Sequence, residues 1–197
     1  MATLSSAMGP AFCDGMQVLD YGCGAARYAH FLRQRLDRFT YFGFERPGSL
    51  VKRGERSIDA AKAIFRDDDR VHVDLIGASL EALAIERANI ALLGSVFTHV
   101  DLDEMRHILT KLMPIVSRKG QIVFTIFLAD EHRLEDPGMY GFHDCYGRSF
   151  FTASQLASLA SALALRLTES DSYVAQDGNL HRVFRADLLA PDAKTGG

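Results

Sequence analysis

Two glycines and two acidic residues have the types and spacing that suit binding of a nucleotide. Asp20, Gly22 and Gly24 lie close together, and Glu45 follows Gly24 at roughly the 20-residue spacing of dinucleotide-binding folds. Glycine permits a tight turn and lets a ligand approach the backbone, while the N–H groups that open a following helix attract negative groups. A carboxylate at the end of the next strand can accept hydrogen bonds from ribose hydroxyls. The set predicts a nucleotide-type ligand, and the alternative is a glycine turn in an α/β protein with an empty crevice.

Two histidines are the best candidates for a general base, if the reaction needs one. His99 follows an expected strand, and His143 lies in a connection rich in aromatic and polar residues, a composition that suits a substrate pocket. Histidine titrates near neutral pH, which suits proton transfer. The alternatives are a helix-start residue satisfied by neighbouring backbone for His99, and a surface loop that folds on itself for His143.

Composition excludes several other kinds of site. The seven histidines form no H-E-x-x-H pattern and the three cysteines form no C-x-x-C pair, so no metal site is expected. The cysteines are expected to be reduced thiols of a cytoplasmic protein. The net charge is −3 and there is no basic stripe, so a nucleic-acid partner is not expected. No apolar run approaches the roughly 20 residues that a membrane span needs, and the first residues do not resemble a secretory signal.

A parallel sheet is needed to position these residues, and the apolar pattern predicts one. Apolar stretches alternate with segments of helical periodicity, which is typical of strands joined by crossover helices. The expected strands are 16–20, 40–45, 70–76, 89–94 and 121–128, the last after a turn at 119–120, and the expected helices include 25–36 and 49–65. We expect one domain over 1–189, with 1–15 as a short N-terminal segment and 190–197 as a flexible tail.

Local signals mark the second half of the chain. Asp101 with Glu104, and Thr152 with Gln155, have the spacing of capping boxes, so a helix is expected to start at each pair. The dipeptide at 177–178 is Asp-Gly, which favours a hairpin between segments 166–175 and 180–188.

The segment 18–27, Val-Leu-Asp-Tyr-Gly-Cys-Gly-Ala-Ala-Arg, resembles the first motif of the Rossmann-like (class I) S-adenosylmethionine-dependent methyltransferases. Ala26 stands where the third glycine of that motif usually lies, and a small residue there still permits close helix packing. Segments 42–45, 94–100 and 112–123 are similar to later parts of the family pattern. The resemblance implies an α/β fold with a seven-stranded, mostly parallel sheet, helices on both faces and a C-terminal antiparallel hairpin strand inserted between the fifth and sixth strands.

The resemblance also implies roles for the residues around the glycines. Asp20, Gly22 and Gly24 would line the methionine part of the cofactor, S-adenosylmethionine. Glu45 would accept hydrogen bonds from both ribose hydroxyls.

Other positions follow from the same resemblance. The acid that usually contacts adenine after the third strand is missing from 76–80, so Ser79, or backbone groups near Leu80, would replace it. Ser95 and Phe97 would flank the methyl-donor side.

The implied activity is methyl transfer to oxygen or nitrogen of a small molecule, such as a sugar or a secondary metabolite. The cofactor carries the reactive group and the protein supplies position, so a base is required only if the acceptor must lose a proton. Two alternatives stay open: a non-catalytic S-adenosylmethionine-binding scaffold of the same fold, and a nicotinamide-dependent oxidoreductase, which the hairpin disfavours. The short N-terminus leaves open an exposed site, a cover around Phe12, closure by a partner subunit in a homodimer, or a chain that is one module of a larger protein.

Overall fold

The computed structural model describes residues 7–9, 12–45, 51–75, 87–135, 147–174 and 178–189, with the backbone alone described at 51–55 and 133–135. The elements occur in the order β1 (Met16–Tyr21), α2 (Arg27–Arg33), β2 (Phe39–Glu45), α3 (Val51–Ile64), β3 (Val71–Leu75), β4 (Ala88–Leu93), α4 (Leu102–Leu112), β5 (Val116–Leu128), β6 (Arg133–Glu135), β7 (Arg148–Phe151), α5 (Ala153–Ala162), β8 (Leu165–Val174) and β9 (Leu180–Leu188). None of the helices in these ranges is long and apolar enough to cross a membrane.

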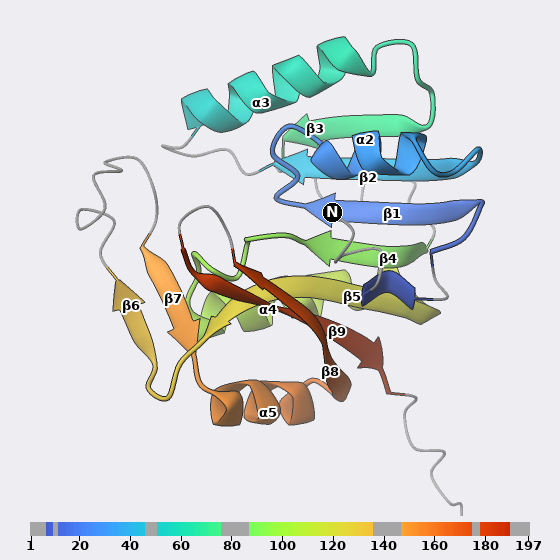
Figure 1. Cartoon of the computed structure of the whole chain (residues 1–197). Coiled ribbons are helices and arrows are strands. Elements are labelled where there is room, and N and C mark those ends of the chain that lie inside the picture. The colour runs from blue at the N-terminus through green and yellow to red at the C-terminus, as the bar shows by residue number, and fades with distance from the viewer. Residues whose placement is uncertain are drawn as a thin grey trace, which may run out of the picture.

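The main sheet has the strand order β3-β2-β1-β4-β5-β9-β8 (Figure 1). The strands from β3 to β5 pair in parallel, whereas β9 pairs antiparallel with both β5 and β8. The last strand in the sequence therefore lies between β5 and β8, as the resemblance implied. This arrangement brings the carboxyl ends of β1, β2 and β4 to one edge of the sheet.

A second, short pair of strands joins the carboxyl end of β5. Strand β7 pairs in parallel with β5 at Phe127↔Phe150, and β6 pairs antiparallel with β7. The sequence predicted only a connection over 129–150, because three- and four-residue strands give too little periodicity to recognise. The seven-stranded main sheet is confirmed, and the described residues add this pair to it.

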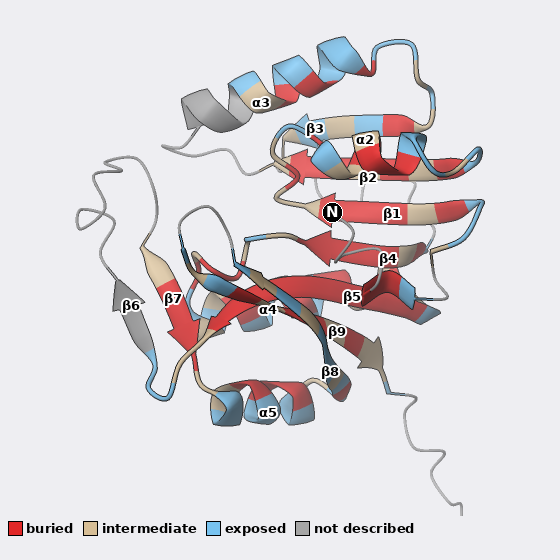
Figure 2. Cartoon of the chain, in the orientation of Figure 1, coloured by how far each residue is buried: buried red, intermediate tan, exposed pale blue. Residues whose placement is uncertain are grey.

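Helices cover both faces of the main sheet, and each face has its own apolar core (Figure 2). Val18 of β1 and Val123 of β5 belong to the core shared with α2 and α3, which we call the α2/α3 layer. Ile122 and Phe124 of β5 belong to the core shared with α4 and α5, the α4/α5 layer. The alternation follows from the strand geometry, in which successive side chains point to opposite faces.

The two helix starts predicted from capping patterns are confirmed. The Asp101 carboxylate accepts a hydrogen bond from the backbone N–H of Glu104 at 2.8 Å and caps α4. Thr152 and Gln155 form a reciprocal capping box at the start of α5. Each such cap satisfies backbone donors that have no partner within the helix, so each fixes where the helix begins.

The predicted turn at 119–120 is wrong, because β5 continues through these residues. Gly120 is buried within the strand, and a Cβ atom there would lie 2.8 Å from the carbonyl oxygen of Asn89. The glycine is therefore required by a close approach of β4, where the pairing register shifts between Ala88 and Ile90, and not by a turn.

Candidate functional site

The loop between β1 and α2 is held tightly against the end of β2. Gly22 and Gly24 have φ values of +78° and +53°, in the left-handed region that glycine adopts without strain. The backbone N–H groups of Gly22 and Cys23 both donate to the carbonyl oxygen of Phe44, at 2.7 and 3.0 Å. We call residues 22–26 the glycine loop. Its shape is fixed by β2, whose parallel register with β1 sets Gly43 opposite Asp20.

Ala26 takes the backbone conformation of the glycine that it replaces. Its φ of +53° is left-handed, it precedes the first residue of α2, and its side chain is completely buried. Alanine tolerates this region less well than glycine, so the loop stores some strain here. Complete burial explains why only a very small side chain fits.

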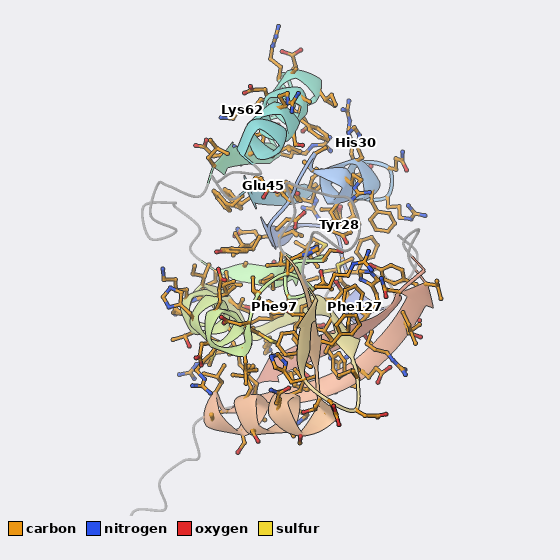
Figure 3. The ribbon with its side chains drawn as sticks, turned by 90° about the vertical axis from the view of Figure 1, so that its left-hand side faces the viewer. Tyr28, His30, Glu45, Lys62, Phe97 and Phe127 are labelled. Atoms are coloured by element: carbon orange, nitrogen blue, oxygen red, sulfur yellow. The ribbon has the colours of Figure 1, made fainter. Side chains whose placement is uncertain are left out.

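Glu45 closes the site from the end of β2. Its Oε2 accepts a hydrogen bond from the backbone N–H of Gly24 at 2.7 Å, and its side chain is half-buried. Figure 3 looks onto the carboxyl ends of the parallel strands and shows Glu45 there, with Tyr28 of α2 in the same upper half of the molecule. Gly24 and Glu45, which the sequence singled out by their spacing, are therefore in direct contact.

Asp20 lies beneath the glycine loop and is completely buried. Its Oδ2 accepts a hydrogen bond from the Tyr41 hydroxyl at 2.6 Å, whereas Oδ1 has no hydrogen-bond partner among the described residues. Burial raises the pKa of Asp20 to about 7, an effect that the Tyr41 hydrogen bond opposes. Tyr41 was not predicted as a site residue, although its alternation with Gly43 on one face of β2 is a usable signal in the sequence. A Cβ atom at Gly43 would lie 3.1 Å from the Tyr41 hydroxyl, so this glycine makes room for the phenol.

The segment after β4 meets the glycine loop from the other side. A Cβ atom at Gly22 would lie 2.6 Å from Cγ2 of Val96, so the two loops touch at this point. Ser95 has a φ of +60°, is exposed, and donates its backbone N–H to the buried Thr125 hydroxyl at 2.7 Å. Thr125 on β5 therefore sets the conformation of Ser95, a role that sequence alone did not indicate.

Phe97, which the resemblance placed beside the methyl donor, is a core residue in the structure. Its side chain is completely buried in the α4/α5 layer, and its ring packs edge-on against Phe124 at 5.2 Å. Figure 3 shows it in the lower half of the molecule, away from Glu45 and Tyr28. Phe97 therefore anchors the loop after β4 in the core.

His99 is half-buried and its Nδ1 lies 3.2 Å from the carbonyl oxygen of Gly147, just before β7. A carbonyl oxygen only accepts, so Nδ1 carries the hydrogen in this contact, and Nε2 of the neutral ring is then the basic nitrogen. No cluster of His, Cys, Asp and Glu suited to a metal ion occurs within the described ranges.

The chain matches known proteins in fold but not in sequence. No family model and no curated protein matches the sequence. An S-adenosylmethionine-dependent methyltransferase from Methanosarcina mazei matches the fold with a TM-score of 0.66 at 15% identity, over 91% of this chain and 96% of that one. This chain has the class I methyltransferase fold.

Two further structures show how varied the chemistry on this class I fold is. The 1,6-didemethyltoxoflavin-N1-methyltransferase of Burkholderia thailandensis, with bound 1,6-didemethyltoxoflavin and S-adenosylhomocysteine, matches with a TM-score of 0.63 at 22% identity, over 92% of this chain and 77% of that one. A pericyclic reaction enzyme matches with a TM-score of 0.63 at 14% identity, over 96% of this chain and 47% of that one. The shared fold therefore does not fix the reaction.

The remaining sequence predictions fall in different places on this class I fold. Ser79, Leu80 and His143 lie outside the described residues. Phe12 packs against Phe31 of α2, with ring centroids 5.8 Å apart, just before the amino end of β1. The glycine loop is at the opposite end of β1, so Phe12 does not cover it.

Proposed function

We propose that this protein is an S-adenosylmethionine-dependent methyltransferase that methylates an oxygen or nitrogen atom of a small molecule. The observation that carries the proposal is the bond between Gly24 and Glu45 at the carboxyl edge of a class I methyltransferase sheet. It brings a glycine turn and a strand-end carboxylate to one place, which is what a nucleoside with a charged tail requires. The methyltransferases that share the fold support the same reaction class.

The residues present fit the proposed cofactor. Backbone groups of the glycine loop would hold its methionine part, and the Glu45 carboxylate would hold the ribose hydroxyls. A carboxylate has about four acceptor positions, so the bond from Gly24 does not exhaust it. We assign the adenine contact to Ser79 or to backbone near Leu80. When bound, the cofactor supplies an electrophilic methyl group on a sulfonium, and the protein then needs only to position the acceptor and exclude water.

For an acceptor that must lose a proton, His99 is our first candidate for the base. Its Nδ1–H is anchored on the Gly147 carbonyl, so the ring presents Nε2 as the proton acceptor. His143 is the second candidate. Ser95, exposed beside Val96 at the contact between the two loops, would flank the methyl-donor side.

The charge of the chain, the position of Phe12 and the cysteines restrict the kind of acceptor, the cover of the site and the compartment that we propose. The net charge of −3 disfavours a nucleic-acid acceptor and supports a small molecule. Because Phe12 lies at the other end of β1, we propose a partner subunit in a homodimer, or a further part of a longer protein, as the cover of the site. We place the protein in the cytoplasm, where its cysteines would stay reduced.

The proposal is tested in two steps. Calorimetry of the folded chain should show binding of S-adenosylmethionine and S-adenosylhomocysteine and none of NAD. Incubation with isotopically labelled S-adenosylmethionine and a panel of hydroxylated and nitrogen-containing small molecules should then show label transfer by mass spectrometry. A folded protein that does not bind S-adenosylmethionine contradicts the proposal, and NAD binding in its place would favour an oxidoreductase.

A second candidate function is a fold that binds the cofactor without transferring the methyl group. It is favoured by the missing acid at the adenine position. The match to a pericyclic reaction enzyme adds that the fold also occurs in a protein that is not named as a methyltransferase. This second candidate predicts retained S-adenosylmethionine binding with no label transfer to any acceptor, and a single methylated acceptor would exclude it.

A further inference from the structure

The carboxyl group of Asp20 has no assigned role in the proposed methyltransferase function. It is completely buried directly before the glycine loop, and only one of its two oxygens has a hydrogen bond in the described part of the chain. A buried carboxylate is stable only when paired or hydrogen-bonded at both oxygens, and otherwise it holds a proton. Among the described residues, Oδ1 of this acid thus has no hydrogen-bond partner for its charge.

The charged and titratable neighbours of Asp20 do not supply that partner. From β2, the Tyr41 hydroxyl stabilises the ionised form, whereas the Glu45 carboxylate opposes it. From α2, Arg27 favours the ionised form but is exposed to solvent, which screens its charge. Burial dominates the balance and raises the pKa of Asp20 to about 7.

Two further groups lie close enough to feel the charge of Asp20. Burial, and after it the Asp20 carboxyl, raises the pKa of the Cys23 thiol in the glycine loop and of the Tyr28 phenol on α2. Both groups therefore stay neutral near pH 7 and neither provides a positive charge. A Cβ atom at Gly94 would lie 2.6 Å from the Tyr28 hydroxyl, so the Tyr28 side chain reaches the end of β4.

We infer, building on the proposed methyltransferase function, that Asp20 carries a proton in the ligand-free protein and releases it to solvent when a positively charged group of the ligand occupies the glycine loop. The ligand's cation then neutralises the carboxylate, and the proton returns when the ligand leaves. The cation is either the α-ammonium or the sulfonium of the methyl donor. Asp20 would thus be a positioning and specificity residue that makes the site prefer a cationic ligand.

Calorimetry in buffers of different ionisation enthalpy measures the protons released for each ligand bound. Near pH 7 we expect about half a proton to be released, rising toward one at pH 6 and falling toward none at pH 9, since the free acid titrates at about 7. Three ligands separate the sources of charge. S-adenosylmethionine carries both cations, S-adenosylhomocysteine carries only the ammonium, and 5′-methylthioadenosine carries neither.

Each pattern of release has one meaning. Release with the first two ligands assigns the ammonium, release with S-adenosylmethionine alone assigns the sulfonium, and methylthioadenosine should release none. If S-adenosylmethionine binds without proton release at pH 6 and 7, the inference about Asp20 is overturned while the methyltransferase proposal stands. If S-adenosylmethionine does not bind, the methyltransferase proposal itself fails.

Two variants make the assignment specific. Asp20→Asn keeps an acceptor for the Tyr41 hydroxyl but cannot exchange a proton, so its release should fall to the background of the ligand's own amine. Tyr41→Phe removes the bond that stabilises the ionised form, so release should shift to higher pH and exceed wild type at pH 8. Thermal unfolding checks that both variants are folded. Should Asp20→Asn prove unfolded, the direction of the Tyr41→Phe shift decides, and lower release than wild type at pH 8 would contradict the inference.

Discussion

The backbone N–H of Gly24 lies 2.7 Å from Oε2 of Glu45, so one hydrogen bond joins the glycine loop to the end of the second strand. The same carboxylate that is proposed to hold the ribose also fixes the conformation of the loop proposed to hold the methionine part. Binding at these two places is therefore coupled through one side chain. A substitution of Glu45 should therefore weaken binding of the methionine part of the cofactor as well as binding of its ribose.

Replacing Glu45 by alanine should weaken binding of S-adenosylhomocysteine by roughly 1.5–3 kcal/mol, because a charged hydrogen bond is lost on both the loop and the ribose side. Glu45→Gln keeps one neutral acceptor, so its affinity should lie between those of Glu45→Ala and wild type. The matched control is Glu169→Ala on β8, which removes an exposed partner of Arg182 on β9 and should leave the affinity unchanged. Calorimetric Kd values check this, and an affinity of Glu45→Ala within twofold of wild type would contradict it.

Gly22→Ala should destabilise the fold more than Gly178→Ala, although both glycines have a φ of +78°. The backbone strain is therefore similar in the two variants. Only at residue 22 does the new Cβ meet another side chain, at 2.6 Å from Cγ2 of Val96, whereas nothing lies within 4 Å at residue 178. Overpacking of this kind costs roughly 1–3 kcal/mol.

Urea unfolding of the two glycine variants measures the difference. The double variant Gly22→Ala with Val96→Ala should regain part of the stability, since it removes the colliding methyl group. Equal losses for Gly22→Ala and Gly178→Ala would mean that the contact between the two loops relaxes freely.

His99→Asn should lower the rate of methyl transfer by about 10²–10⁴-fold for an acceptor that must be deprotonated, because it removes the basic nitrogen. Asparagine can still donate to the Gly147 carbonyl and so keeps the anchor of the ring. Cofactor affinity should stay the same. His107→Asn, on the exposed surface of α4, serves as the control. An unchanged rate of methyl transfer in His99→Asn would reduce His99 to a structural anchor.

Asp20→Asn should change how stability depends on pH in the absence of any ligand. The pKa of Asp20 is raised from 3.8 to about 7 in the folded protein, so the folded state binds more protons than the unfolded state between these values. The carboxyl group therefore lowers stability progressively as pH rises from about 4 to 7. Relative to wild type, Asp20→Asn should gain free energy of unfolding over this range, by at most about 4 kcal/mol.

Urea unfolding at pH 5, 6, 7 and 8 measures that gain. Asp14→Asn is a control of opposite type, because its hydrogen bonds with exposed Arg38 lower the pKa of Asp14. Asp14 is ionised in both states above its unfolded value, so the difference between this variant and wild type should stay constant over the same range. A constant difference for Asp20→Asn as well would show that Asp20 is already ionised at pH 5.

The sequence predicted the fold and the proximity of Gly24 and Glu45 because these depend on local signals. Periodicity marked the strands, and the capping pair Thr152 and Gln155 marked a helix start that the structure confirms. The spacing of Gly24 and Glu45 sufficed because adjacent parallel strands end at the same edge of the sheet. A contact that follows from strand order alone can be read from one sequence.

Other features depend on register and side-chain direction, which local patterns encode only in part. The bond from Tyr41 to Asp20 requires Gly43 to leave space between two strands. Phe97 turns into the core after Ser95, whose backbone is left-handed. Its burial therefore depends on a φ value that cannot be predicted from a serine in the sequence. Gly120 looks like a turn residue in the sequence. It lies within a strand, where a side chain would collide with the carbonyl oxygen of Asn89 on the neighbouring strand.

The two halves of the site are rooted in different layers of the molecule. Cys23 and Ala26 of the glycine loop are buried in the α2/α3 layer, whereas Phe97 and Val100, after β4, are buried in the α4/α5 layer. Amino-acid changes that accumulate in one layer can reshape its loop while the sheet shields the other. Under the proposed function, a lineage built on this scaffold can therefore exchange one acceptor for another over evolutionary time and keep the same methyl donor throughout.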